Sequence, residues 1–318
     1  MENGDIIVSD KVRLGLIGIG KIARDQHLPA LAADLGFTLA AIASRHAVLE
    51  NLPSYLDLDA MLAGGHGLTA VSIATPPYGR FEIARAAIAA GLHVMLEKPP
   101  GATVAEVVDL ADRAAAAGVT LFAAWHSRAA AGVDGAREWL ADKQVRTVQI
   151  DWREDIQVWH PGQDWILEAG GFGVFDPGIN ALSIATRILP EALIVEAADL
   201  GVPEGREAPL TAALVLRHGA ARMRAEFDFL HTGPQLWDIT VETDTGTLAL
   251  RDGGKRLSID GAERHCDGPG EYPRLYRQFA NLIAARKCDV DLRPLQLVAD
   301  AFLLGSRTVL PRFDWAVL

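Results

Sequence analysis

The chain has 318 residues, of which half are apolar and 22% are charged. A single hydrophobic core rarely grows to this size, so two domains are expected. The formal charge is −11 at pH 7. Because a surface this acidic repels phosphate backbones, nucleic acid is excluded as a partner. Cys266 and Cys288 stand far apart in the sequence and indicate neither a disulfide framework nor a zinc site, which fits a reducing compartment.

The start of the chain and its longest uncharged stretch both argue against export or membrane insertion. Residues 1–5 are polar and acidic and lack the basic segment of a signal peptide. Residues 60–79 contain no Asp, Glu, Lys or Arg, but the glycines and prolines among them would break a spanning helix. The sequence therefore predicts a soluble, cytoplasmic protein with no membrane partner.

Residues 1–125 alternate short β-branched runs with alanine-rich helical runs. This alternation, with short connections, is typical of a parallel sheet with helices on both faces, so the first domain is predicted to have a doubly wound α/β fold. The expected strands are 12–19, 37–43, 70–74, 92–96 and 119–123, and the expected helices are 22–33, 81–90 and 104–117. Gly118 follows the last helix, where a left-handed cap is expected.

The pattern changes after Trp125. Residues 126–318 are predicted to form an α+β domain, with a mainly antiparallel, open-faced sheet that helices cover on one face. The expected strands are 147–158, 211–216, 220–229, 237–243 and 246–250, and turn-like sequences at 217–219 and 244–246 predict hairpins. Helices are expected after Asp176, over 272–285 and over 294–310, the last of which is expected to pack back on the first domain.

The first predicted strand runs into Gly18–Ile19–Gly20–Lys21–Ile22–Ala23, a G-x-G-x-x-A pattern between a strand and a helix. Such glycines allow a tight turn and close approach of a pyrophosphate, which the N-terminal amides of the helix then bind. The pattern predicts a dinucleotide site that includes Gly18, Gly20, Lys21 and Ile22. A plain strand–helix turn of another doubly wound fold is the alternative.

Ser44 and Arg45 follow the second predicted strand, where NAD-selective sites usually carry an acidic residue for the ribose 2′-hydroxyl. Ser44 does not repel a 2′-phosphate, and Arg45 pairs with one, stacks on the adenine or is a solvated loop charge. The expected cofactor is therefore NADP or NAD. Thr75, Pro76 and Tyr78 follow a buried strand and form either a wall of the nicotinamide site or only a rigid turn.

Glu97–Lys98–Pro99–Pro100 ends the strand predicted at 92–96. The prolines fix the chain, so Lys98 leaves the strand tip at a defined angle and is able to take part in proton transfer from a substrate hydroxyl. With the glycine loop about 80 residues earlier, this sequence resembles the glucose–fructose oxidoreductase/inositol dehydrogenase/rhizopine catabolism family. The resemblance covers nearly the whole chain. It implies a catalytic Lys98, Glu97 at the cofactor site and a homodimer formed through the open sheet.

The same family has a second pattern, which ends in Asp-x-Gly-x-His on a helix. Asp176 matches it, but Asn180 stands at the histidine position and cannot titrate. This variant, together with residues 152–155 and 159–163, is similar to a narrower group of the family that oxidises the anomeric carbon of L-arabinose and D-galactose. The resemblance implies that the sugar site is lined by Lys98, Glu154, His160, Asp176 and Asn180, and that Ser44 and Arg45 face the adenosine phosphate.

The residues give independent support for part of this site. Glu154 shares one strand face with apolar side chains such as Ile150 and Trp152. A carboxylate in such a row needs a hydrogen-bond partner, either a sugar hydroxyl or an arginine in an internal salt bridge. His160 lies on the same face only if the strand stays regular.

Asp176 and Asn180 are four residues apart, so their side chains share one helix face and are able to grip adjacent hydroxyls. The alternative is that Asp176 is an ordinary helix N-cap before Pro177. His126 follows the last strand of the first domain and either hydrogen-bonds the sugar or the nicotinamide amide or only links the domains. The remaining aromatic residues either bind ligand or pack in the core: Trp159 and Trp237 are assigned to the sugar, and Trp165 to the cofactor.

The sequence thus predicts an NAD(P)-dependent enzyme that oxidises the C1 hydroxyl of an aldopyranose, L-arabinose or D-galactose, to the 1,5-lactone. Lys98 and Asp176 are expected to share the O1 proton, and Asn180 to hold the anomeric hydroxyl. Glu154 and His160 are expected to select the ring hydroxyls. No metal site is predicted. The alternatives are an inositol or other polyol dehydrogenase and a non-catalytic nucleotide-sensing regulator.

Overall fold

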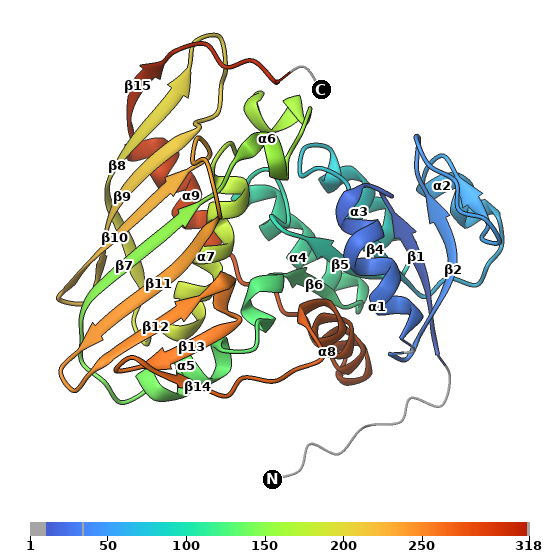
Figure 1. The fold of residues 1–318 in the computed structure, drawn as a ribbon. Helices are drawn as coiled ribbons and strands as arrows, with labels where there is room; N and C mark the ends of the chain where they lie inside the picture. The colour runs from blue at the N-terminus through green and yellow to red at the C-terminus, as the bar shows by residue number, and fades with distance from the viewer. Residues whose placement is uncertain (1–10, 34, 317–318) are drawn as a thin grey trace. The chain divides into compact units, whose positions relative to one another are not determined.

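The computed structural model describes residues 11–33 and 35–316 (Figure 1). The chain divides into two compact units. The first unit comprises residues up to Trp125 together with residues 269–291, and the second comprises residues 126–268 together with those from Leu292 onward. The segment 269–291 therefore lies in the first unit, although the sequence pattern assigned it to the second domain. Within the described residues, no helix is long and apolar enough to cross a membrane.

The first unit contains a parallel sheet, whose described strands run in the order β3-β2-β1-β4-β5-β6. Strands β4 and β6 are buried along their whole length, as expected when helices cover both faces of a sheet. The predicted doubly wound α/β fold is confirmed. The strands are β1 Val12–Ile17, β2 Phe37–Ala43, β3 Ser54–Tyr55, β4 Ala70–Ile73, β5 His93–Glu97 and β6 Leu121–Ala124.

The helices of this unit begin and end largely where the sequence indicates. Helix α4 begins with a capping box, in which Thr103 and Glu106 each accept a backbone hydrogen bond from the other residue, and it ends at Gly118 with φ of 66°. The helices are α1 Leu28–Ala32, α2 Leu58–Ala63, α3 Arg80–Ala89, α4 Val104–Ala117 and α8 Glu271–Ala285.

The helix predicted over 22–33 is not regular. After two α-helical residues, Lys21 and Ile22, it contains a π-helical turn, η1 Ala23–His27, and is α-helical again from Leu28. The side chain of His27 is fully buried and bonded to polar groups inside the unit. Those bonds hold the wider turn in place of a regular one.

Helix α8 packs on the first unit through aromatic contacts. The ring of Phe279 stacks on Phe37 at 5.7 Å and lies 6.1 Å from Phe122. All three rings are buried. Burial of these rings explains why a segment that lies between strands β14 and β15 of the second sheet in the sequence belongs to the first unit.

The second unit contains a mixed, mainly antiparallel sheet in the order β14-β13-β12-β11-β7-β10-β9-β8-β15. In the described residues β7 pairs with β10 and β8 with β15 in parallel, and the other neighbours are antiparallel. The strands are β7 Val145–Arg153, β8 Leu193–Pro203, β9 Thr211–His218, β10 Ala221–Asp228, β11 Leu236–Thr243, β12 Thr247–Arg251, β13 Arg256–Ile259, β14 Ala262–Arg264 and β15 Ser306–Leu310.

Helices α5, α7 and α9 pack on one face of this sheet (Figure 1). Phe175 of α7 contacts Phe227 of β10, whereas the neighbouring Glu226 and Asp228 point to the opposite face because side chains alternate along a strand. The helical elements are η2 His126–Ala129, α5 Val133–Leu140, α6 Ile156–Trp159, η3 Asp164–Leu167, α7 Phe175–Ile188, η4 Asp252–Gly254 and α9 Arg293–Leu304.

Two predicted elements of the second unit are wrong in part. The strand expected over 147–158 ends at Arg153, because the carboxylate of Asp155 accepts from the N–H of Gln157 and starts α6. The helix expected over 294–310 ends at Leu304, and Gly305 is extended. Residues 306–310 instead add strand β15 beside β8, where backbone pairing replaces the helical bonds. Helix α9 packs on β8 and α7 of its own unit.

The aromatic packing of α8 predicts the effect of one substitution. Phe279→Ala should lower the free energy of unfolding by about 3–5 kcal/mol, because it removes a buried ring between two others. Urea unfolding followed by circular dichroism measures this value. Asn281→Ala, at an exposed position of the same helix, is the control and should change it by less than about 0.5 kcal/mol. Equal losses in the two variants would contradict the assignment of α8 to the core.

Candidate functional site

The glycine loop follows β1 and leaves its backbone open. Gly18 has φ of 89°, and a Cβ there would lie 2.8 Å from the carbonyl carbon of Ala74, so only glycine fits. A Cβ on Gly20 would meet nothing within 4 Å. Lys21 is exposed and forms an ion pair with Asp25 one turn further on. The loop therefore offers free space beside exposed backbone at the start of a helix, which is what a pyrophosphate requires.

Ser44 and Arg45 lie directly after β2. The Ser44 hydroxyl accepts a hydrogen bond from the backbone N–H of His46 at 3.3 Å. Arg45 is exposed, and among the described residues no carboxylate pairs with it. A guanidinium and a hydroxyl at this place suit a phosphate and present no negative charge to repel it.

The loop after β4 carries an unsatisfied polar group. The hydroxyl of Thr75 is buried and has no hydrogen-bond partner among the described residues. Pro76 is exposed, and Tyr78 is 78% exposed. Because a buried hydroxyl without a partner is costly, Thr75 is suited to bond a ligand at this edge of the sheet. The open loop, the free guanidinium and this hydroxyl together fit a bound dinucleotide.

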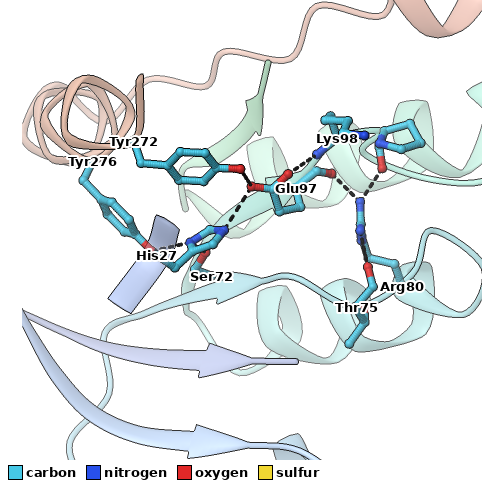
Figure 2. A network of polar contacts seen from close by, with 9 residues as sticks. His27, Ser72, Thr75, Arg80, Glu97, Lys98, Tyr272 and Tyr276 are labelled. Carbon is cyan, nitrogen blue, oxygen red and sulfur yellow. Dashed lines mark hydrogen bonds and ion pairs between the residues drawn. The ribbon is translucent and has the colours of Figure 1, made fainter. Parts of the chain in front are cut away.

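Arg80, at the start of α3, ties this loop to the end of β5 (Figure 2). Its side chain is buried and donates from Nε to the carbonyl oxygen of Thr75 at 3.1 Å. Nη1 donates to the carbonyl oxygens of Glu97 and Pro99, on either side of Lys98. No sequence motif marks Arg80, because a lone arginine at the start of a predicted helix gives no sign that its side chain turns inward.

Glu97 is buried at the end of β5 and accepts several hydrogen bonds (Figure 2). Its Oε1 accepts from the hydroxyl of Tyr272 at 2.7 Å and lies 3.0 Å from Nε2 of His27. Its Oε2 accepts from the backbone N–H of Lys98 at 2.9 Å. The carboxylate therefore lies inside the unit, bonded to protein groups.

The second layer of this network contains Tyr276 and Ser72. The Tyr276 hydroxyl lies 2.7 Å from Nδ1 of His27, and the Ser72 hydroxyl lies 3.4 Å from it. With Nε2 protonated, His27 donates to Glu97, and its Nδ1 accepts from the nearer hydroxyl, that of Tyr276. Burial raises the pKa of Tyr272 and of Tyr276, and the negative charge of Glu97 raises both further. Both phenols therefore remain hydrogen-bond donors. We call His27, Ser72, Glu97, Tyr272 and Tyr276 the Glu97 network.

Lys98 follows at the strand tip and is half-buried between the buried residues Glu97 and Pro99. The Lys98–Pro99 peptide bond is cis. The backbone N–H of Lys98 and the carbonyl oxygens of Glu97 and Pro99 are all hydrogen-bonded to side chains. The side chain of Lys98 therefore projects from a backbone that hydrogen bonds fix on both sides.

The second unit contains a separate cluster of titratable side chains around Glu154. This residue is buried, and its Oε2 accepts from Nε1–H of Trp237 at 2.8 Å. Nε2 of His160 lies 3.2 Å from the other carboxylate oxygen, Oε1. The partners of Glu154 are thus a histidine and a tryptophan, and the predicted alternative of an internal salt bridge with arginine is wrong.

His160 brings a second carboxylate into this cluster. Its Nε2 lies 4.0 Å from Oδ2 of Asp176, which is 6% exposed. The short helix α6 interrupts the predicted strand and places His160 at its end, so strand alternation is not what positions this residue. We call Glu154, His160 and Asp176 the carboxylate–histidine cluster.

Asp176 is the second residue of α7, and the N-cap is Val174. The alternative that Asp176 is an ordinary N-cap is therefore wrong. A carboxylate in the first turn still gains from the helix dipole. Asn180, four residues later on the same helix, is half-buried.

Trp237, which bonds Glu154, packs against two further tryptophans. Trp237 stacks on Trp152 at 5.9 Å between ring centroids and lies 5.0 Å from Trp159 at a tilt. Trp159 and Trp237 are half-buried and Trp152 is buried. Half-buried indole faces beside carboxylates suit a ligand with one apolar face and several hydroxyls.

The remaining predicted residues lie at separate places in the second unit. Trp165 is half-buried in η3, and His126 is half-buried at the start of η2 with its Nδ1 3.3 Å from the Ser127 hydroxyl. Among the described residues, no group of three His, Cys, Asp or Glu side chains has the arrangement of a metal site.

A glycine turn with open backbone at the start of a doubly wound sheet is typical of a dinucleotide-binding protein. A family model described as an oxidoreductase family with an NAD-binding Rossmann fold matches residues 12–125. Galactose 1-dehydrogenase of Pseudomonas fluorescens is 44% identical over 95% of this chain and 98% of its own length. D-xylose 1-dehydrogenase (NADP(+)) 2 of Haloferax volcanii is 30% identical over 74% of each chain. The crystal structure of D-galactose-1-dehydrogenase from Rhizobium etli has 49% identity and a TM-score of 0.92, covering 96% of this chain and 98% of that one.

The chain belongs to the glucose–fructose oxidoreductase/inositol dehydrogenase/rhizopine catabolism family, as predicted. It is an oxidoreductase with an NAD-binding Rossmann domain.

Two glycine substitutions separate the folding role of the glycine loop from its binding role. Gly18→Ala should destabilise the protein by about 2 kcal/mol or more, because it combines positive φ with contact to the Ala74 backbone. Gly20→Ala should leave stability nearly unchanged and weaken NADPH binding at least tenfold, because its methyl group occupies free space beside the loop. Thermal unfolding without ligand and fluorescence titration with NADPH measure the two effects. Binding of NADPH to Gly20→Ala as to the unchanged protein would contradict a pyrophosphate site here.

Proposed function

We propose that this enzyme is an NAD(P)-dependent sugar 1-dehydrogenase that oxidises D-galactose and L-arabinose at C1 to their 1,5-lactones. The carboxylate–histidine cluster is the observation that carries the proposal. It provides buried hydrogen-bond acceptors beside half-buried indole rings. The likeness to galactose 1-dehydrogenases over nearly the whole chain supports the same substrate class.

Oxidation at C1 converts the hemiacetal carbon and its hydroxyl to a lactone carbonyl, so a hydride leaves C1 and a proton leaves O1. When bound, the nicotinamide supplies the acceptor for the hydride. Gly18, Gly20, Lys21 and Ile22 would hold the pyrophosphate, and Thr75, Pro76, Tyr78 and Trp165 would flank the rest of the cofactor. Lys98 has a backbone fixed on both sides, so it is suited to hydrogen-bond O1 at a constant position.

In this mechanism Lys98 and Asp176 both act on the O1 proton, either directly or through hydrogen bonds. Asn180 is a neutral amide that is able to donate and accept, so it would hold the anomeric hydroxyl without competing for the proton. Asn180 shares a helix face with Asp176, which supports hydrogen bonds from both side chains to hydroxyls at one end of the sugar ring.

Glu154 and His160 would select the configuration of the ring hydroxyls. Trp237 fixes one oxygen of Glu154 and His160 lies beside the other, so the carboxylate presents its remaining lone pairs in a set direction. Trp159 and Trp237 would pack against the apolar face of the pyranose, and His126 would contact its edge. L-Arabinose and D-galactose share ring configuration and differ by one hydroxymethyl group. Such a difference changes binding by only about 1–3 kcal/mol, so both sugars should be oxidised.

We further propose that the enzyme accepts NADP as well as NAD. Ser44 and the exposed Arg45 support this, because neither repels a 2′-phosphate and the guanidinium is suited to pair with it. A cytoplasmic location is proposed as well, because Cys266 and Cys288 are free thiols.

A homodimer formed through the open face of the second sheet is also part of the proposal. Arg222, Arg224 and Glu226 of β10 alternate with buried residues and point away from α7. A face that carries both positive and negative side chains is able to pair with a second copy of itself across a two-fold axis.

A substrate screen tests the proposed reaction. D-Galactose and L-arabinose should each give reduced nicotinamide with NADP and with NAD, whereas myo-inositol should give none, because Asn180 replaces a titratable histidine. Absorbance of the reduced cofactor follows the reaction, and hydroxamate assay identifies the lactone. Turnover of myo-inositol alone would instead assign a polyol dehydrogenase. Tight NADPH binding without turnover of any sugar would assign a regulator.

Two single substitutions test the proton-transfer residues. Lys98→Ala and Asp176→Asn should each lower kcat for D-galactose by about a hundredfold or more, because each removes a group that acts on the O1 proton. Asp176→Asn should leave NADPH affinity unchanged. Glu138→Gln, at an exposed position on α5, is the control and should keep full activity. Undiminished turnover by Lys98→Ala would rule out the mechanism.

A further inference from the structure

The Glu97 network contains buried titratable groups that the mechanism above does not use. His27 is fully buried, and Glu97 and Tyr272 are 3% and 2% exposed. No substrate or cofactor contact is assigned to His27 or Tyr272. Buried polar groups of this kind are costly, so their arrangement calls for a physical explanation.

The network connects segments that are far apart in the sequence. His27 comes from the helical turn that follows the glycine loop, and Tyr272 comes from α8, 175 residues after Glu97. Both bond the same oxygen of Glu97, while the other oxygen bonds the backbone N–H of Lys98 (Figure 2). The orientation of this carboxylate therefore determines whether the Lys98 N–H keeps its acceptor.

The π-helical turn has a direct part in this arrangement. A π turn inside a helix often marks a functional site, because its extra residue redirects a side chain. Here the last residue of the turn is His27, which is buried between Glu97 and Tyr276. The helix that begins at the glycine loop is thereby bonded to the segment that carries Lys98.

We propose that Tyr272 and His27 are positioning residues for Lys98. They fix the Glu97 carboxylate, which in turn holds the backbone N–H of Lys98. Arg80 holds the carbonyl oxygens on either side of Lys98, so the Glu97 network completes the restraint of the lysine backbone. The inference rests on the proposed function of Lys98.

Removing one hydroxyl should release this restraint without removing a ring. Tyr272→Phe keeps the aromatic packing and deletes one of the two partners of Glu97 Oε1, so only His27 still restrains that oxygen and the carboxylate is held less tightly. A displacement of about 1 Å at a reacting group lowers the rate about a hundredfold. Tyr272→Phe should therefore lower kcat for D-galactose about ten- to a hundredfold, with the sugar KM and the NADPH Kd changed less than about twofold.

Tyr55→Phe is the matched control. Tyr55 also hydrogen-bonds a histidine, His66, within the first unit, but neither residue contacts the Glu97 network. This variant should keep kcat within about twofold of the unchanged enzyme. An equal loss of kcat in both variants, or no loss in Tyr272→Phe, would overturn the proposal. If Tyr272→Phe does not fold, Tyr276→Phe removes the bond to Nδ1 of His27 and should give a smaller loss in the same direction.

A double substitution distinguishes positioning of Lys98 from a general structural effect. If Tyr272 acts through Lys98, adding Tyr272→Phe to Lys98→Ala should lower the residual kcat by less than about twofold. If the second substitution again multiplies the loss about tenfold or more, Tyr272 acts by another route and the proposal is wrong.

Hydrogen exchange tests the positioning without any sugar. Pro99 and Pro100 carry no amide hydrogen, so Lys98 is the last exchanging position in a peptide that ends at Pro100. In the full chain with NADPH, Tyr272→Phe should speed exchange there about tenfold, and Tyr55→Phe should not. Unchanged exchange in Tyr272→Phe would contradict the inference. Absence of sugar turnover in the unchanged enzyme would contradict only the proposed function.

Discussion

The buried carboxylate of Glu97 is the interaction on which the rest of the first unit depends. A buried anion is stable only when it accepts several hydrogen bonds, so its donors must come together as the chain folds. These donors are the imidazole of His27, the hydroxyl of Tyr272 and the backbone N–H of Lys98. The requirement links the glycine-loop helix, the tip of β5 and helix α8, although strands β7 to β14 of the second sheet come between β5 and α8 in the sequence.

The second unit uses a buried carboxylate differently. One carboxylate oxygen of Glu154 accepts a hydrogen bond from Trp237, and the other lies beside Nε2 of His160. The same Nε2 lies 4.0 Å from Oδ2 of Asp176. In the Glu97 network a carboxylate restrains the backbone, whereas in the carboxylate–histidine cluster the side chains form a polar group bordered by half-buried tryptophans. The same residue type therefore supports positioning in one unit and is suited to hydroxyl recognition in the other.

Periodicity in the sequence predicts the elements whose local pattern and packing agree. Strand β2 and helix α4 have the predicted bounds, because the alternation of strand-like and alanine-rich runs and the glycine after α4 are local signals. The pattern fails where a local signal was not recognised or a long-range pairing prevails. Asp155 ends β7 by capping α6, and the segment after Gly305 pairs with β8 although it continues a helical pattern. Strand β8 was not predicted. It pairs with β9 and β15, which are separate segments of the chain, so its own sequence does not reveal the pairing.

The sequence by itself determined the doubly wound fold, the glycine loop and the family, because these are carried by short motifs and their spacing. Only the tertiary structure decided which groups satisfy the buried charges. His27, Arg80, Tyr272 and Tyr276 had no motif to mark them, and Glu154 was paired with a histidine and an indole where an arginine was the alternative. Side-chain partners of this kind depend on contacts between distant segments, which no local pattern of residues encodes.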